Sequence, residues 1–411
     1  MLGTSRVRLL SIVTVLALVA GDAAAGPRCA GRHWVGVWAA NPSDAANDGF
    51  AEQSLRLIVT PTLGGRRARV RLSNRFGPRP VMFAASWIAR RESGATLVPR
   101  SARRLRFGGR RTVTIPAGEE VVSDSVLFRF EAFEDLAVSL YVMGESGPAT
   151  EHMLALQTSY ASPPGSGDHS AEHAGDAFTV DSGRRAYVMG VEVLATDHVG
   201  AVVALGDSIT DGTGSPENLN ERYTDFLARR LADAALGRPR LPVLNAGIGA
   251  TGVGDGPLSA PHRLQADVIE QPGARVVIVM DGTNNTADGS SSTDEIIAAL
   301  RTIVDRLHAA RLSVLLGTLT PSKGTVFSAH GSPEAITVRN RVNDWIRTGG
   351  GADGVVDFHA ALRDPDDFDR LRPEYDSGDH VHPSVAGYQA MALAVDLGLL
   401  RAPACSKPRR N

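Results

Sequence analysis

The sequence predicts two folded parts, an α/β domain built on a parallel sheet and a β-sandwich that precedes it. The chain has 411 residues and a hydrophobic fraction of 43%, which is enough for two domains with a core each. Up to about residue 198, apolar and polar residues alternate in short runs, as in half-buried strands. After residue 200, continuous apolar runs alternate with segments of helical spacing, which indicates strands alternating with helices.

The first 25 residues have the features of a secretory signal peptide. Arg6 and Arg8 precede an apolar run at 9–20, and the alanines at 23–25 offer a cleavage site. The apolar run is too short to span a bilayer, so no stable membrane anchor is expected. A buried N-terminal helix is the alternative. We therefore expect residues 1–25 to be removed and the protein to be secreted or periplasmic.

Residues 26–198 form the predicted β-sandwich. Several runs with period-two alternation are bounded by Gly, Pro and Asn, which is typical of antiparallel strands joined by turns. These runs lie at 55–59, 67–72, 111–115, 136–142 and 187–193. Residues 162–181 are rich in Ser, Gly, Asp and His and predict a loop inside this domain.

Residues 199–402 form the predicted α/β domain, and residues 403–411 form a C-terminal tail. Apolar runs typical of buried parallel strands lie at 201–205, 243–244, 276–280 and 312–316. Segments with helical spacing lie at 223–231, 296–307, 338–346 and 385–397. Functional residues of such sheets lie in loops at the carboxyl ends of the strands, so these loops are where we look for chemistry.

The two cysteines, Cys29 and Cys405, lie near the two ends of the predicted mature chain. Export exposes a protein to an oxidising compartment, so a disulfide between them is one expectation. Two unpaired thiols are the other.

Composition restricts the partners of the protein. The formal net charge is −2, from 43 basic and 45 acidic residues, and the basic clusters are short. A nucleic-acid partner is therefore not expected. The chain has no phosphate-binding loop and no dinucleotide fingerprint, so we expect no cofactor. The sequence leaves the oligomeric state open.

Two loops of the α/β domain carry the residue types of a serine hydrolase. Ser208 follows the first apolar run in the segment Gly-Asp-Ser-Ile, although a serine at this position is often only a helix cap. Asp379 and His382 lie three positions apart, so one turn can bring the carboxylate against the imidazole. A carboxylate that orients a histidine base beside a serine is the arrangement that activates the hydroxyl.

Two other interpretations of these loops are disfavoured. His380 could join Asp379 and His382 in a metal site, but no second cluster is placed to complete the ligand shell, so we expect no metal. The chain contains no Gly-x-Ser-x-Gly elbow, which disfavours an α/β-hydrolase.

Four blocks in a fixed order resemble the SGNH (GDSL-type) hydrolase family. The outer blocks surround Ser208 and His382, and the middle blocks read Asn-Ala-Gly-Ile-Gly-Ala at 245–250 and Asp-Gly-Thr-Asn-Asn at 281–285. With its β-rich first part, the chain resembles a bacterial subfamily of secreted esterases. The resemblance implies a three-layer α/β/α sandwich with a five-stranded parallel sheet. It also implies that Ser208 is the nucleophile, His382 the general base and Asp379 its orienting partner.

The resemblance further implies an oxyanion hole. Its donors would be the N–H of Ser208, an N–H of the second block and the side-chain amide of Asn284. The second block usually has a glycine where this chain has Ala250, which would be strained at positive φ, and Gly249 is the alternative donor. The third block usually has an aspartate where this chain has Asn285, and we expect loss of the carboxylate to alter how that loop is held.

Together these features predict a carboxylic ester hydrolase that forms an acyl-serine intermediate. The family resemblance suggests short-chain acyl esters, acetyl esters first, of a small molecule or a glycan. The alternatives are a lipid esterase or lysophospholipase, an acyltransferase with the same site, and a glycan-binding protein without catalytic activity.

Overall fold

The computed structural model describes residues 31–45, 48–233, 241–287, 289, 291–325 and 329–400. The predicted signal peptide, Cys29, Cys405 and the predicted tail at 403–411 lie outside these ranges. The disulfide and the export signal therefore stay predictions.

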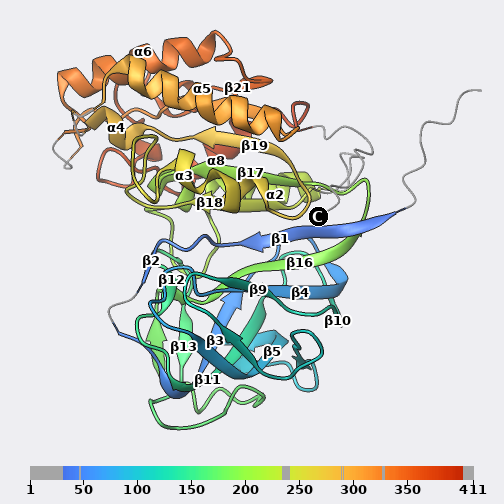
Figure 1. The fold of residues 1–411 in the computed structure, drawn as a ribbon. Coiled ribbons are helices and arrows are strands. Elements are labelled where there is room, and N and C mark those ends of the chain that lie inside the picture. The colour runs from blue at the N-terminus through green and yellow to red at the C-terminus, as the bar shows by residue number, and fades with distance from the viewer. Residues whose placement is uncertain are drawn as a thin grey trace, which may run out of the picture.

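Two antiparallel sheets pack face to face in the N-terminal part (Figure 1). In spatial order, the first consists of β1 (Arg32–Ala39), β16 (Val188–Thr196), β4 (Gly65–Ser73) and β10 (Val126–Phe130), with β9 (Glu120–Val122) also beside β4. The second consists of β14 (Val180–Ser182), β13 (Ser159–Ala161), β3 (Ala51–Val59), β11 (Leu136–Glu145), β5 (Val81–Ser93) and β6 (Thr96–Leu97), with β7 (Arg103–Arg104) and β8 (Val113–Ile115) also beside β5.

Alternation of side chains along each strand builds the core of this sandwich. In β4, the side chains of Ala68, Val70 and Leu72 are fully buried, whereas those of Arg69 and Arg71 are partly exposed. Buried residues of both sheets contact one another in a single apolar cluster. The β-rich N-terminal region that the sequence predicts is thus present.

A third, small antiparallel sheet lies at the edge of the sandwich. Its strands are β15 (Arg185–Ala186), β12 (Thr150–His152) and β2 (Asp44–Ala45), with β12 in the middle. Two hydrogen bonds connect the chain around β12 to the α/β domain. One joins His152 to Asp211, and the other runs from Arg222 to the carbonyl of Ala155.

The C-terminal part is built on a five-stranded parallel sheet, as predicted. The strand order is β18 (Val243–Gly247), β17 (Ala201–Gly206), β19 (Ala274–Met280), β20 (Ser313–Gly317) and β21 (Gly354–Val356). Gly206 at the end of β17 pairs with Gly247 on one side and Met280 on the other, so the following loops start at one edge of the sheet. The apolar runs of the sequence miss β21, which has only three residues.

Helices cover both faces of this sheet, which confirms the three-layer architecture. Residues of α3 (Ala260–Leu264), α5 (Thr293–Ala309) and α6 (Pro333–Arg347) pack in one cluster with Val203 and Leu205 of β17. Residues of α2 (Tyr223–Ala232), α7 (Phe358–Leu362) and α8 (Val385–Ala394) pack in another cluster with Val202 and Ala204. Short helical segments complete the domain: α1 (Ser208–Asp211), η2 (Gln265–Ile269), α4 (Thr283–Ala287) and η3 (Pro373–Tyr375). Among the described residues, no helix is both long and apolar enough to cross a membrane.

Two helices begin earlier than their apolar spacing indicates. The hydroxyl of Ser292 caps α5 by accepting the N–H of Glu295, and the hydroxyl of Ser332 caps α6 by accepting the N–H of Ala335. First turns held by polar caps carry little apolar periodicity, so the spacing alone places the start of each helix too late.

The sandwich contacts the α/β domain through β1 (Figure 1). Val35 of β1 belongs to the same apolar cluster as β17, and the N–H of Gly36 donates to the carbonyl of Pro272 at 2.8 Å. Thr62 accepts the N–H of Val243 at 3.0 Å, at the start of β18. The two parts are therefore joined by packing and by hydrogen bonds.

Candidate active site

The loop after β17 turns sharply because Gly206 has no side chain. A Cβ at this position would lie 2.2 Å from the Thr210 hydroxyl and 2.4 Å from the carbonyl oxygen of Met280. Asp207 then caps α1, since its Oδ1 accepts the N–H of Ile209 at 3.0 Å. Ser208 is the first residue of the helix, so its hydroxyl is not used as the cap.

Ser208 and His382 meet although 174 positions separate them in the sequence. The Ser208 Oγ lies 2.9 Å from His382 Nε2. On the other side of the ring, His382 Nδ1 lies 2.6 Å from Asp379 Oδ2. The three side chains thus form one hydrogen-bonded chain from the hydroxyl to the carboxylate.

Backbone N–H groups hold the carboxylate of Asp379 in place. Its Oδ1 accepts from the N–H of His382 at 2.8 Å and from the N–H of Val381 at 3.0 Å. Partial burial acts to raise the pKa of Asp379, but the hydrogen bonds from His382 and Val381 outweigh burial and lower the pKa. The carboxyl is therefore ionised where the imidazole needs an acceptor.

The second-block loop places Ala250 in the left-handed region, with φ of 60°. A residue with a Cβ is strained there, at a cost of roughly 1–2 kcal/mol. Gly249, the alternative donor, already donates its N–H to Asp211 Oδ2 at 3.1 Å. Of the two predicted donors, Ala250 is the one whose N–H has no hydrogen-bond partner among the described residues, and it lines the same cleft as Ser208.

The side chain of Asn284 also lines this cleft. Its Nδ2 donates to the carbonyl of Thr251 at 2.6 Å, and its Oδ1 lies 3.2 Å from His330 Nε2. One N–H of the amide is thus used to hold the second-block loop, and an amide nitrogen carries a second. His330 fixes the plane of the amide from the opposite side.

Asn285 holds its loop without a carboxylate. Its Oδ1 accepts the N–H of Val253 at 2.7 Å, and its Nδ2 donates to Ser291 at 3.3 Å. A Cβ on Gly252 would lie 2.2 Å from this Oδ1, so the close approach requires a glycine. The amide oxygen of Asn285 accepts this N–H as a carboxylate oxygen would. The third block thus stays hydrogen-bonded to the second-block loop.

A cleft of about 540 Å³ opens at Ser208. Ser208, Ala250, Asn284 and His382 lie in its wall together with mostly apolar side chains. These apolar side chains are Met153, Leu154, Ile209, Ile248, Leu258 and Val381. Ser43, Met153 and Leu154 come from the N-terminal part of the chain, so both parts form the cleft.

Two buried carboxyl groups lie at the turn around Ser208. Asp207 and Asp281 are 0% and 1% exposed. Burial, reinforced by the nearby Asp281, raises the pKa of Asp207 to about 7, and burial raises the pKa of Asp281 as well. Arg263 lies near both and donates to the carbonyl of Gly206. Arg263 thus connects the buried carboxyl group of Asp281 to the backbone of this turn.

His380, the candidate for a metal site, binds a different carboxylate. Its Nδ1 contacts Asp376, whereas His382 contacts Asp379. Within the described ranges, no group of three or more His, Cys, Asp and Glu side chains could hold a metal ion. The two pairs lie side by side in one loop without converging.

Sequence reasoning missed several contributors to the site. Met153 and Leu154 line the cleft from the other domain, and His330 contacts Asn284 from a loop outside the four blocks. None of them lies in a motif, and no local pattern marks them. Their places follow only from tertiary packing.

Residues 204–390 match the model of the GDSL-like lipase/acylhydrolase family. The α/β domain belongs to this family. The protein is accordingly a carboxylic ester hydrolase of the GDSL type, with an N-terminal β-rich region outside the matched residues.

The solved structures that are similar to this chain cover about half of it. A member of the lipolytic G-D-S-L family from Veillonella parvula is 20% identical, with a TM-score of 0.37, covering 47% of this chain and 94% of its own. A GDSL-like lipase from Bacteroides thetaiotaomicron is 18% identical, with a TM-score of 0.38 and coverage of 50% and 88%. Axe2, an acetylxylan esterase from Geobacillus stearothermophilus, is 25% identical, with a TM-score of 0.36 and coverage of 48% and 94%. No curated protein matches the chain.

Proposed function

We propose that this GDSL hydrolase cleaves short-chain acyl esters through an acyl-serine intermediate on Ser208. The observation that carries the proposal is the contact of 2.9 Å between the Ser208 hydroxyl and His382 Nε2, continued by Asp379 on Nδ1. A carboxylate on Nδ1 keeps the proton on that nitrogen and leaves Nε2 free to accept one. Ser208 thereby gains a base within hydrogen-bond reach.

The reaction proceeds in two balanced halves. The Ser208 oxygen bonds to the ester carbonyl carbon while His382 Nε2 takes the hydroxyl proton. The C–O bond to the alcohol then breaks, and His382 returns the proton to the leaving alkoxide. In the second half, a water molecule bonds to the acyl carbon while His382 Nε2 takes its proton. The bond from the acyl carbon to the Ser208 oxygen then breaks, His382 returns the proton to Ser208, and the acid leaves.

In each half of the reaction, negative charge develops on the carbonyl oxygen, and hydrogen-bond donors must stabilise it. The proposed donors are the N–H of Ser208, the N–H of Ala250 and the side-chain amide of Asn284, all of which come from residues of the cleft wall. Each such donor in an oxyanion hole contributes about 3–4 kcal/mol to stabilisation of the transition state. Gly249 is the weaker candidate, since Asp211 already accepts its N–H.

The proposed substrates carry a short acyl chain, with acetyl esters first and carbohydrate as the candidate alcohol. The family resemblance and the signal-like segment at 1–25 support an exported enzyme of this kind. The apolar wall of the cleft favours a second candidate, an ester with a longer acyl chain. Each buried methylene would contribute about 0.8 kcal/mol to binding.

A Ser208→Ala variant tests the mechanism on p-nitrophenyl acetate. We expect kcat/KM to fall at least about a thousandfold. The control is Ser377→Ala, an exposed serine of the last loop, which should retain wild-type rates. Mass spectrometry of the wild-type enzyme mixed with a slow ester should find one acyl group on the Ser208 peptide. Equal rates for the two variants would refute the proposal.

A panel of substrates then separates the two candidates. It comprises acetate, butyrate and octanoate esters of p-nitrophenol, together with acetylated oligosaccharides. A maximum of kcat/KM at acetate, with release of acetate from the glycan, supports the first candidate. A maximum at octanoate without release from the glycan supports the second. Added alcohol acceptors show whether part of the acyl group is transferred to an alcohol in place of water.

A further inference from the structure

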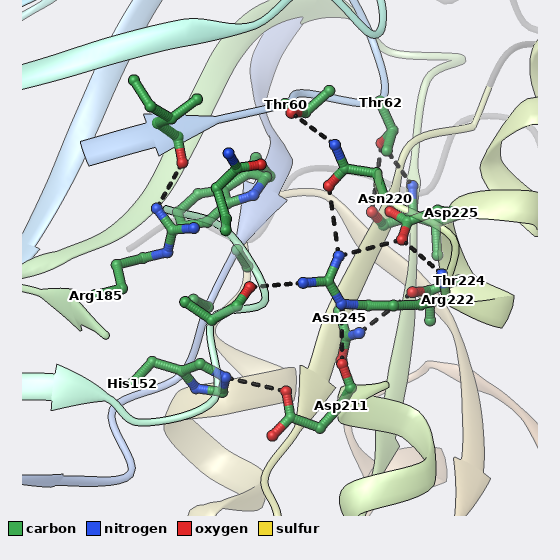
Figure 2. Close-up of a pocket in the computed structure, with 17 residues that line it drawn as sticks. Thr60, Thr62, His152, Arg185, Asp211, Asn220, Arg222, Thr224, Asp225 and Asn245 are labelled. Carbon is green, nitrogen blue, oxygen red and sulfur yellow. Dashed lines mark hydrogen bonds and ion pairs between the residues drawn. The ribbon is translucent and has the colours of Figure 1, made fainter. Parts of the chain in front are cut away.

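His152 crosses from the N-terminal part to the α/β domain. It ends β12 and is 5% exposed, and its Nε2 lies 3.0 Å from Oδ1 of Asp211, which is 4% exposed. Asp211 is the last residue of α1, the helix that starts at Ser208. Figure 2 shows the imidazole of His152 directed at this carboxylate.

Both ring nitrogens of His152 face acceptors. Nδ1 lies 2.7 Å from the carbonyl oxygen of Asn41, and a carbonyl cannot donate. With an ionised Asp211 at Nε2, both nitrogens carry a proton and the ring is an imidazolium. Burial acts to lower the pKa of His152, but Asp211 and the bond to Asn41 outweigh burial and raise the pKa.

The carboxylate of Asp211 reaches the second-block loop with its other oxygen. Oδ2 accepts the N–H of Gly249 at 3.1 Å, one residue before Ala250. A Cβ on Gly247 would lie 2.1 Å from the nitrogen of Asp211, so α1 and the end of β18 are in close contact. A chain of contacts thus runs from the β-sandwich side through Asp211 to the loop of the proposed oxyanion donor.

We propose that His152 and Asp211 form a positioning pair with which the N-terminal domain holds the second-block loop in its catalytic conformation. This inference rests on the proposed function. His152 does not touch the reacting atoms, and it acts through Asp211 and Gly249. The α/β domain carries the nucleophile, and the N-terminal domain completes the oxyanion side.

Other charged groups surround the pair. Arg185 on β15 opposes the protonation of His152, and Arg222 donates through Nε to the main-chain oxygen of Asp211 at 2.9 Å. With Asp225, which pairs with Arg222, these groups line a small cavity of about 60 Å³ (Figure 2). Arg222 also donates to the main chain of the N-terminal part, through the carbonyl of Ala155 at 2.6 Å.

The pair predicts an alkaline loss of activity. A histidine whose pKa is raised on folding stabilises the fold fully below its unfolded value of 6.5 and loses that contribution as the pH rises through the folded pKa. A neutral ring has one proton for two acceptors. The bond to Asn41 or the bond to Asp211 is then lost, and the loop is held less firmly.

The test compares His152→Gln, Asp211→Asn and the double variant on a short-chain ester between about pH 5.5 and 9, a range that spans the ordinary histidine pKa. We expect kcat of His152→Gln to fall about tenfold with KM changed less than about threefold. Asp211→Asn can accept from Gly249 and donate to a neutral His152, so its alkaline loss should disappear. The double variant should be no slower than the slower single variant, because the pair acts as a unit.

A matched control weakens the same interface elsewhere. Thr62→Val removes the hydrogen bond to Val243 at the opposite end of β18. It should lower the Tm and leave kcat and its pH profile unchanged. A His152→Gln variant with a lowered Tm and an unchanged kcat at every pH would overturn the proposal, and so would effects of the single variants that multiply in the double variant.

Ring ¹⁵N shifts of histidine in the wild-type protein give a second readout, for the case that His152→Gln does not fold. Comparison with Asp211→Asn assigns the signal of His152. Two protonated nitrogens at neutral pH support the pair, and a neutral ring at pH 6 overturns it. These shifts do not depend on ester hydrolysis, so they remain informative if Ser208→Ala stays active and the proposed mechanism itself is wrong.

Discussion

The two sides of the proposed active site are held in different ways. On the nucleophile side, Asp379 and His382 are three positions apart, and backbone N–H groups of the same turn fix the carboxylate. On the oxyanion side, the loop that contains Ala250 is held by Asp211 of α1 and by Asn284 and Asn285 of α4. Asp211 is in turn held by a residue of the N-terminal part.

This difference separates local from tertiary determinants of catalysis. The orientation of the base depends on a few consecutive residues and can persist if distant contacts weaken. The orientation of the oxyanion donors depends on packing between loops and between domains. Mutations on the side of Asp379 and His382 should therefore abolish ester hydrolysis. Mutations on the side of Ala250 should lower its rate only in part.

The largest loss of activity is expected from Asp379→Asn, on the nucleophile side of this comparison. The new amide would place a donor at Nδ1 of His382 and leave the proton on Nε2, where it blocks transfer from Ser208. We expect kcat to fall by about 10³–10⁴. Asp376→Asn is the matched control, because Asp376 binds the neighbouring His380 in the same loop. Similar losses in both variants would show that the loop, and not the base, was disturbed.

Asn284→Ala tests the oxyanion side at its side-chain donor. Loss of the amide should lower kcat by about 10²–10³, as for one donor of an oxyanion hole. The loss should be smaller than that for Asp379→Asn, since Ser208 and Ala250 still donate. Asn285→Asp is the control, because its carboxylate can still accept the N–H of Val253 and kcat should stay near the wild-type value. A wild-type kcat for Asn284→Ala would exclude its amide from the transition state.

The same contrast explains which features the sequence predicts. Period-two alternation in β4 and the apolar run in β17 reflect burial of consecutive residues, and both appear in the structure. The Asp-x-x-His spacing reflects a single turn, and the contact between Asp379 and His382 follows from it. Such features depend on residues that are neighbours in the sequence, so local patterns predict them.

Long-range contacts leave no such signal. His152 and Asp211 are 59 positions apart, and their pairing depends on how β12 docks on the α/β domain. His330 reaches Asn284 over 46 positions from a loop without a motif. The three-residue strand β21 is too short to show an apolar period. Neither residue pair nor strand could be predicted from local pattern.

A smaller effect is expected at the wall that the N-terminal domain contributes to the cleft. Met153 is 49% exposed and lines the cleft beside Leu154. In Met153→Ala, loss of about 1 kcal/mol of apolar contact should raise KM for butyrate or longer esters about fivefold and leave acetate almost unchanged. Met143→Ala, also 49% exposed but outside the cleft, is the control. An equal change for all chain lengths would show that the acyl chain does not contact this wall.

The smallest effect is expected at Ala250, where the backbone stores strain. Ala250→Gly removes the Cβ from a residue with φ of 60° and adds flexibility to the unfolded chain. The net result should be a gain of up to about 1 kcal/mol in the free energy of unfolding, measured by urea titration, with kcat within about threefold of the wild type. Ala246→Gly in the neighbouring strand is the control and should destabilise the protein, because a strand interior gains nothing from a glycine. If Ala250→Gly instead destabilises the protein and lowers kcat, the methyl group contributes packing that outweighs its strain, and the oxyanion loop depends on this side chain as well as on Asp211.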